Sequence, residues 1–144
     1  MGKEQSGFRM SALHEDFLKD THKSNRQIKP KTSTRQIGAE KEQLAVAYLQ
    51  EQGYEIIACN FVCRQGEIDL IARKSPYLIF IEVKYRKSNR FGSAEEAVTM
   101  KKQMRIQKAA QYYLYKEKIP QNTPCRFDVV AINQEQIELI ENAF

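Results

Sequence analysis

The chain has 144 residues, 42% of them apolar, which suffices for one ordinary domain with a buried core. It has no apolar stretch of membrane-spanning length and no secretory signal pattern, so we expect a soluble cytoplasmic protein without a membrane partner. The three cysteines, Cys59, Cys63 and Cys125, are an odd number, which argues against a disulfide framework, and we expect reduced thiols, with Cys59 and Cys63 as small buried side chains.

Most of the net charge of +5 lies at the beginning of the chain. Residues 1 to 37 hold eight Lys or Arg against four Asp or Glu and lack a hydrophobic period. This composition predicts a basic, flexible N-terminal tail, followed by a domain at residues 38 to 144. Two roles are open for the tail, which are helping to hold a polyanion and simply increasing solubility.

Hydrophobic periodicity in residues 38 to 144 predicts helices and strands in the order α-β-β-β-α-β. The first helix is expected at residues 38 to 52, where Gly53 ends it. The second helix is expected to begin with a capping box formed by Ser93 and Glu96 and to continue to Pro120. Strands are expected at residues 54–60, 67–73, 77–85 and 126–132, with a further one at 136–140.

Four charged residues interrupt the apolar strands between residues 66 and 86, namely Glu67, Asp69, Glu82 and Lys84. If these strands form an antiparallel hairpin whose turn is centred between residues 75 and 76, Asp69 lies opposite Glu82 and Glu67 opposite Lys84. Facing residues point to the same side of a sheet, roughly 4.5 to 5.5 Å apart. The hairpin therefore predicts one cluster of charge on one face.

Two opposed carboxylates repel each other, and in a partly buried site one of them takes up a proton unless a cation lies between them. Oxygen ligands of this kind suit Mg²⁺ or Mn²⁺, and Lys84 is placed to orient a water that attacks a phosphodiester. The alternative is a set of structural ion pairs, Glu67 with Lys84 and Asp69 with Arg64 or Arg86. The direct opposition of two carboxylates favours the metal site.

Several motifs follow one another along residues 38 to 140: Glu42-x-x-Ala45-x-x-Tyr48-Leu49, Gly66-Glu67-Ile68-Asp69-Leu70-Ile71-Ala72, Phe80-Ile81-Glu82-Val83-Lys84-Tyr85-Arg86, Phe91-Gly92 with Glu96-Ala97-Val98, and Lys101 with Arg105. Together they resemble the YraN-type family of predicted bacterial endonucleases. That family belongs to the PD-(D/E)XK, restriction-endonuclease-like superfamily and is similar to archaeal Holliday junction resolvases. Two positions depart from the pattern, because Ile68 replaces a proline and Lys41 a glycine.

The resemblance implies an α/β fold in which helices flank a mixed, restriction-endonuclease-like sheet. It implies that Asp69, Glu82 and Glu42 hold the metal, that the Val83 carbonyl is a further ligand and that Lys84 activates water. Glu67 would support them. For Glu42 the alternative is a favourable charge at a helix N-terminus. By analogy with the resolvases, the resemblance also implies a homodimer.

The segment from Lys84 to Lys118 is strongly basic, with ten Lys or Arg against three acidic residues. We predict that six of these bind nucleic-acid phosphates: Lys101, Arg105, Lys108, Arg86, Lys87 and Arg90. The spacing of Lys101, Arg105 and Lys108 places these three on one helical face. A solvated helix surface is the alternative. The neighbouring tyrosines at positions 112, 113 and 115 are expected to pack, at least in part, against the sheet.

These observations predict a Mg²⁺-dependent endonuclease acting on structured or branched DNA. RNA is a weaker candidate, although nothing in the sequence itself separates RNA from DNA. The alternative is a nucleic-acid-binding module that keeps the nuclease fold without turnover.

Overall fold

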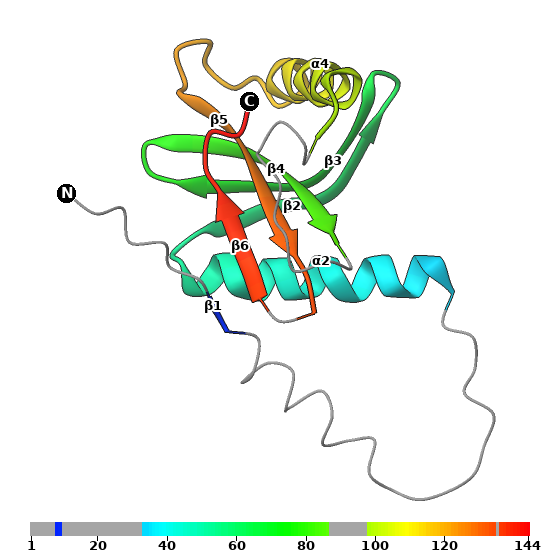
Figure 1. Ribbon diagram of the computed structural model, residues 1–144. Coiled ribbons are helices and arrows are strands. Elements are labelled where there is room, and N and C mark those ends of the chain that lie inside the picture. The colour runs from blue at the N-terminus through cyan, green and yellow to red at the C-terminus, as the bar shows by residue number, and fades with distance from the viewer. Residues whose placement is uncertain (1–7, 10–32, 87–97, 135) are drawn as a thin grey trace, which may run out of the picture.

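Two helices lie on opposite sides of a mixed sheet in the computed structural model, which describes residues 8–9, 33–86, 98–134 and 136–144 (Figure 1). The helices are α2 (Thr34–Glu51) and α4 (Met100–Lys116). The strands are β1 (Phe8–Arg9), β2 (Glu55–Cys63), β3 (Gly66–Lys74), β4 (Tyr77–Tyr85), β5 (Cys125–Ile132) and β6 (Gln136–Ile140). The predicted order of elements is confirmed, including the final strand, and neither described helix has the apolar length needed to cross a membrane.

The sheet has the strand order β1-β6-β5-β4-β3-β2. Only β4 and β5 run parallel, and this pair lies at the centre of the sheet. Every other neighbouring pair is antiparallel. A parallel pair needs a crossover between its strands, and α4 lies in that crossover, where it covers one face of the sheet.

The first helix begins four residues before the expected start, at Thr34. Ser33 caps it, because its hydroxyl accepts a hydrogen bond from the Gln36 backbone N–H, while the Gln36 side chain accepts one from the Ser33 N–H. The helix therefore takes its first turn from the region assigned to the tail. The strand β1 also belongs to that region, and it pairs with β6. Residues 1–7 and 10–32 lie outside the described part of the chain, so the flexibility of the tail stays a prediction.

The second helix is capped by Thr99, whose hydroxyl accepts a hydrogen bond from the Lys102 N–H. The predicted capping box at Ser93 lies outside the described residues, and the helix ends at Lys116, before the expected limit. All three cysteines are free thiols. Cys59 is exposed, contrary to our expectation, because it lies on β2 at the edge of the sheet.

The hairpin of β3 and β4 has the predicted register, since Leu70 pairs with Ile81 and Lys74 with Tyr77. Alternate residues of its strands enter two separate cores. The core beneath α2 includes Ala45, Tyr48, Leu49, Leu70, Ile79 and Ile81. The core beneath α4 includes Ile68, Ile71, Leu78, Phe80, Ile106, Ala109 and Tyr113.

Candidate functional site

The backbone pairing of β3 and β4 ends at Leu70 and Ile81, and a side chain continues the contact. Beyond that pair, Oδ2 of Asp69 accepts a hydrogen bond of 2.8 Å from the backbone N–H of Val83. The carboxylate thus satisfies a donor that would otherwise need a main-chain partner. This bond holds Asp69 against β4 at the point where the two strands separate.

Asp69 and Glu82 form a pair of interacting carboxyl groups. Glu82 is only 3% exposed. Burial and the charge of Glu82 raise the pKa of Asp69 to about 6, against the opposing effects of the Val83 N–H and of Lys102. The positive charge near the pair therefore does not fully offset the burial and the mutual repulsion of the two carboxylates, which is the electrostatic condition that favours a bound cation.

Lys102 completes this cluster, although it was not among the predicted site residues. Its Nζ lies 2.9 Å from Oε1 of Glu82. Burial lowers the pKa of Lys102, but the hydrogen bond with Glu82 and the charges of Glu82, Asp69 and Glu67 outweigh this effect and raise it. A signal existed, because Lys102 has the same helical phase as the buried Ile106 and Ala109, which face the sheet.

Glu42 does not join this cluster. It lies on α2, the helix that covers the opposite face of the sheet, and its carboxylate accepts a hydrogen bond of 2.8 Å from Asn60. Within the described part of the chain, no three Asp, Glu, His or Cys side chains gather closely enough to hold a metal ion. Because the helix begins at Thr34, Glu42 is also not at a helix N-terminus, so that alternative is wrong. Its role as a metal ligand stays a prediction.

Glu67 and Lys84 do not face each other in the paired part of the hairpin. Glu67 is exposed and pairs with Val62 of β2, whereas Lys84 is half-buried and pairs with Ala131 of β5. The strands have separated before the register reaches these residues. Glu67 still contributes to the site electrostatically, through its effect on Lys102.

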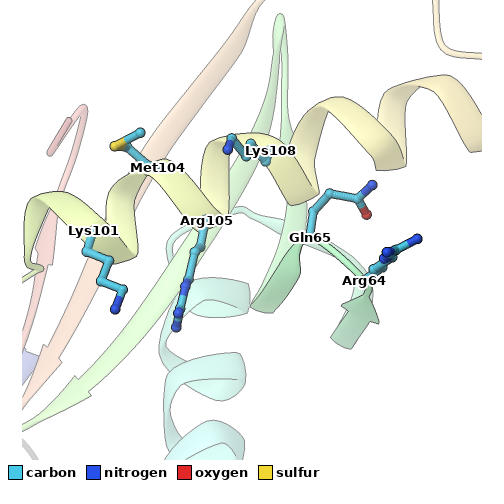
Figure 2. Close-up of a pocket in the computed structure, with 6 residues that line it drawn as sticks. All are labelled: Arg64, Gln65, Lys101, Met104, Arg105 and Lys108. Atoms are coloured by element: carbon cyan, nitrogen blue, oxygen red, sulfur yellow. The ribbon is translucent and has the colours of Figure 1, made fainter.

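A basic hollow of about 530 Å³ lies along α4 (Figure 2). Its walls come from α4 and from the turn between β2 and β3, and they consist of Arg64, Gln65, Lys101, Met104, Arg105 and Lys108. The predicted common face of Lys101, Arg105 and Lys108 is thus confirmed, while Arg64 is an additional cation. In Figure 2 the side chains of Lys101 and Arg105 extend from the helix in the same direction.

The turn and the helix approach each other closely at Gly66. A Cβ atom on this residue would lie 3.0 Å from the backbone oxygen of Arg105. Gly66 begins the strand that carries Asp69, and Arg105 follows Lys102 by one helical turn. This close packing connects the basic hollow to the carboxyl pair.

The remaining predicted phosphate ligands lie on the chain that leaves β4. Arg86 is half-buried, and its backbone N–H donates a hydrogen bond of 2.8 Å to the carbonyl of Ile132. Lys87 and Arg90 fall outside the described residues. Their contacts with nucleic acid stay predictions.

Sequence comparison places the chain in a family. A family profile described as "Uncharacterised protein family UPF0102" matches residues 41–132, which run from α2 to the end of β5. The chain belongs to the UPF0102 family. The UPF0102 match includes Asp69, Glu82 and Lys102, together with all the residues around the basic hollow.

Individual UPF0102 proteins are similar over most of their own length. The chain is 54% identical to a UPF0102 protein of Lachnoclostridium phytofermentans over 107 residues, which are 74% of this chain and 91% of the relative. It is 50% identical to one of Saccharophagus degradans, with the same two coverages. It is 45% identical to one of Thermodesulfovibrio yellowstonii, over 76% of this chain and 96% of the relative. These names assign no activity.

Proposed function

We propose that this UPF0102 protein is a metal-dependent nuclease that hydrolyses phosphodiester bonds at Asp69 and Glu82. The observation that supports this most strongly is the pair of interacting carboxyl groups beneath α4. Glu82 is nearly fully buried, and burial of Asp69, together with the charge of Glu82, raises the pKa of Asp69. A chain that needed only stability would gain little by opposing two acids in a core.

The donor set fits a hard divalent cation. Asp69 and Glu82 offer carboxylate oxygens, which Mg²⁺ and Mn²⁺ prefer, and the mutual repulsion of the pair would be relieved by a cation between them. When bound, such an ion would polarise a phosphoryl oxygen and lower the pKa of a water. The ammonium of Lys102 already supplies one positive charge at Glu82, and its side chain, 47% exposed, has room to move aside.

The surroundings of the pair fit a polyanionic substrate. The helix α4 carries five Lys or Arg and no Asp or Glu, and three of these line the basic hollow. Phosphates held there would lie beside the carboxyl pair, since Arg105 packs on the first residue of the strand that bears Asp69. The family resemblance favours structured or branched DNA over RNA. It also implies a homodimer, which stays a prediction, as does the cytoplasmic location.

A non-catalytic nucleic-acid-binding module is the second candidate, supported by the basic hollow alone. The two functions differ in what they require of the carboxyl pair. A binding module gains nothing from acids that repel a phosphate backbone, so neutralising Asp69 would strengthen its binding.

Cleavage assays separate these functions. Linear, single-stranded and branched DNA and an RNA of matched length are incubated with the protein in Mg²⁺ or Mn²⁺, beside Asp69→Asn and Lys84→Ala. We expect both variants to lose cleavage by at least a hundredfold and to retain binding in EDTA. Glu55→Gln is the matched control, because Glu55 is an exposed acid on β2. Cleavage that survives Asp69→Asn would assign the activity to another site or to a contaminant.

Salt dependence tests the basic hollow. Each phosphate contact releases counterions, so the slope of log K against log salt should become shallower by about 0.9 for duplex DNA when Arg105 is replaced by Gln. Lys118→Gln is the control, because Lys118 follows the end of α4 and does not line the hollow. Equal slopes for Arg105→Gln and the unmodified protein would place the phosphates elsewhere.

A further inference from the structure

The outer face of α4 carries a stripe that is basic at one end and aromatic at the other. Five residues follow one another along it at alternating spacings of four and three, which place them on one side of a helix: Lys101, Arg105, Lys108, Tyr112 and Tyr115. The first three line the basic hollow. The last two follow it directly along the helix.

The two tyrosines are unusually accessible. Tyr115 is 82% exposed, so the expectation that it packs against the sheet is wrong. Tyr112 is 38% exposed and stacks on Phe61 of β2, with ring centroids 6.4 Å apart and planes inclined by 28°. Tyr113, by contrast, is buried as expected. An aromatic ring as exposed as that of Tyr115 contributes little to the folded state, because it removes little apolar surface from water.

The charge of the helix determines what fits on this face. With five basic and no acidic residues in α4, an equivalent face of a second copy would bring like charges together. A polyanion has the complementary charge. Basic residues followed by exposed aromatic rings are the combination that holds single-stranded nucleic acid, where phosphates contact the cations and bases stack on the rings. In a continuous duplex the base faces are covered by neighbouring pairs.

We propose that Tyr115, supported by Tyr112, stacks on an unpaired base of a strand whose phosphates lie along the basic residues of α4. The seven helical steps from Lys108 to Tyr115 span roughly 10 Å of helix. The inference rests on nucleic acid being the ligand of the proposed function, but not on hydrolysis. It makes the preferred substrate a single strand or a junction with unpaired bases.

Binding measurements in EDTA test this inference without any cleavage. Fluorescence anisotropy gives Kd for three labelled ligands of equal charge: a thymidine single strand, an abasic single strand and a blunt hairpin duplex. We expect Tyr115→Ala to weaken binding of the thymidine strand by at least fivefold and to change the other two by less than twofold. Tyr115→Phe should restore the binding, because stacking needs only the ring. Gln111→Ala, an exposed substitution on the same helix, is the control.

Each other outcome overturns a defined claim. The stacking of Tyr115 on a base would be overturned if Tyr115→Ala bound the thymidine strand as tightly as the unmodified protein does. It would also be overturned if the substitution weakened binding of the abasic strand by the same factor. Either result would leave the proposed function standing. A dimer that Tyr115→Ala converts to a monomer in sedimentation would make this face a self-association surface and would also overturn it. If the unmodified protein bound none of the three ligands, the proposed function itself would fail.

Discussion

At the scale of single residues, the site depends on three charged groups that share one small volume. Asp69 is held by a backbone N–H, and Glu82 by the ammonium of Lys102. The single positive charge of Lys102 therefore interacts with both acids. The consequences for stability can be measured separately from activity.

The raised pKa of Asp69 predicts a pH-dependent stability. The folded protein binds the proton more tightly than the unfolded chain, so the stabilising contribution is complete below about pH 4 and is lost as the pH rises to about 6. Asp69→Asn keeps an acceptor for Val83 and removes the charge. At pH 7.5 we expect the variant to be more stable in urea unfolding, by on the order of 1 to 3 kcal/mol, with no difference near pH 4. A less stable variant at pH 7.5 would show that the ionised carboxylate is favoured in the folded protein.

Removing Lys102 should leave Glu82 buried without its counter-charge. We expect Lys102→Met to lower stability by about 1 to 3 kcal/mol, less than for a fully buried pair because the lysine is half exposed. Millimolar Mn²⁺ or Mg²⁺ should raise the Tm of this variant more than that of the unmodified protein, since the cation would replace the missing charge. Lys101→Met, on the neighbouring exposed position, is the control. The absence of any cation effect on Lys102→Met would argue against a metal at this pair.

At the scale of elements, the position of α4 over β3 brings the basic hollow to the carboxyl pair. Lys102 reaches the sheet from the same helix whose outer face lines the hollow. The contact between Gly66 and the backbone of Arg105 determines how closely α4 can approach the start of β3. The two described helices therefore differ in role, because α2 covers a core on the far face.

Two glycine substitutions test this arrangement. Gly66→Ala would place a methyl group 3.0 Å from the Arg105 carbonyl, and we expect it to destabilise the protein by about 1 to 3 kcal/mol and to weaken DNA binding. Gly38→Ala is the matched change on α2, where nothing lies within 4 Å, and it should stabilise by about 0.5 to 1 kcal/mol. Urea unfolding and Kd in EDTA measure both. Wild-type binding by Gly66→Ala would show that the helix can shift without disturbing the hollow.

At the scale of the whole molecule, a buried ionic network joins distant parts of the chain. Asp128 of β5 is fully buried and accepts hydrogen bonds from Arg126 and from the backbone N–H of Asn142. Arg126 also donates to the hydroxyl of Tyr54, just before β2. The network thus connects the entry to β2, the central strand β5 and the C-terminal residues.

Breaking this network should be costly. Asp128→Ala leaves the largely buried guanidinium of Arg126 without its main partner, so we expect a loss of about 3 to 5 kcal/mol in the free energy of unfolding. Glu141→Gln is the control, because Glu141 is half exposed and 3.8 Å from Arg126, and it should cost less than about 1 kcal/mol. Equal losses of unfolding free energy in the two variants would mean that the exposed Glu141 stabilises the network as much as the buried Asp128 does.

Much of this architecture was predictable from local patterns. The bounds of β4 and β6 match the expected ones because each strand is a short segment rich in apolar residues that begins after a turn or loop signal. The early start of α2 was predictable in principle, since Ser33 and Gln36 have the capping-box spacing, but the polar composition of the region led us to assign it to the tail. The exposed Tyr115 could not be distinguished from Tyr113 without knowing which face of α4 meets the sheet.

The sequence by itself determined that Asp69 and Glu82 meet, because a short turn sets the register of a hairpin within a few residues. Only the tertiary structure decided that Lys102 joins them and that Glu42 does not, because both depend on which face of the sheet each helix covers. Hairpin pairing is a local property of the chain. Helix placement follows from burying two separate apolar cores, and distant parts of the sequence contribute to each of them.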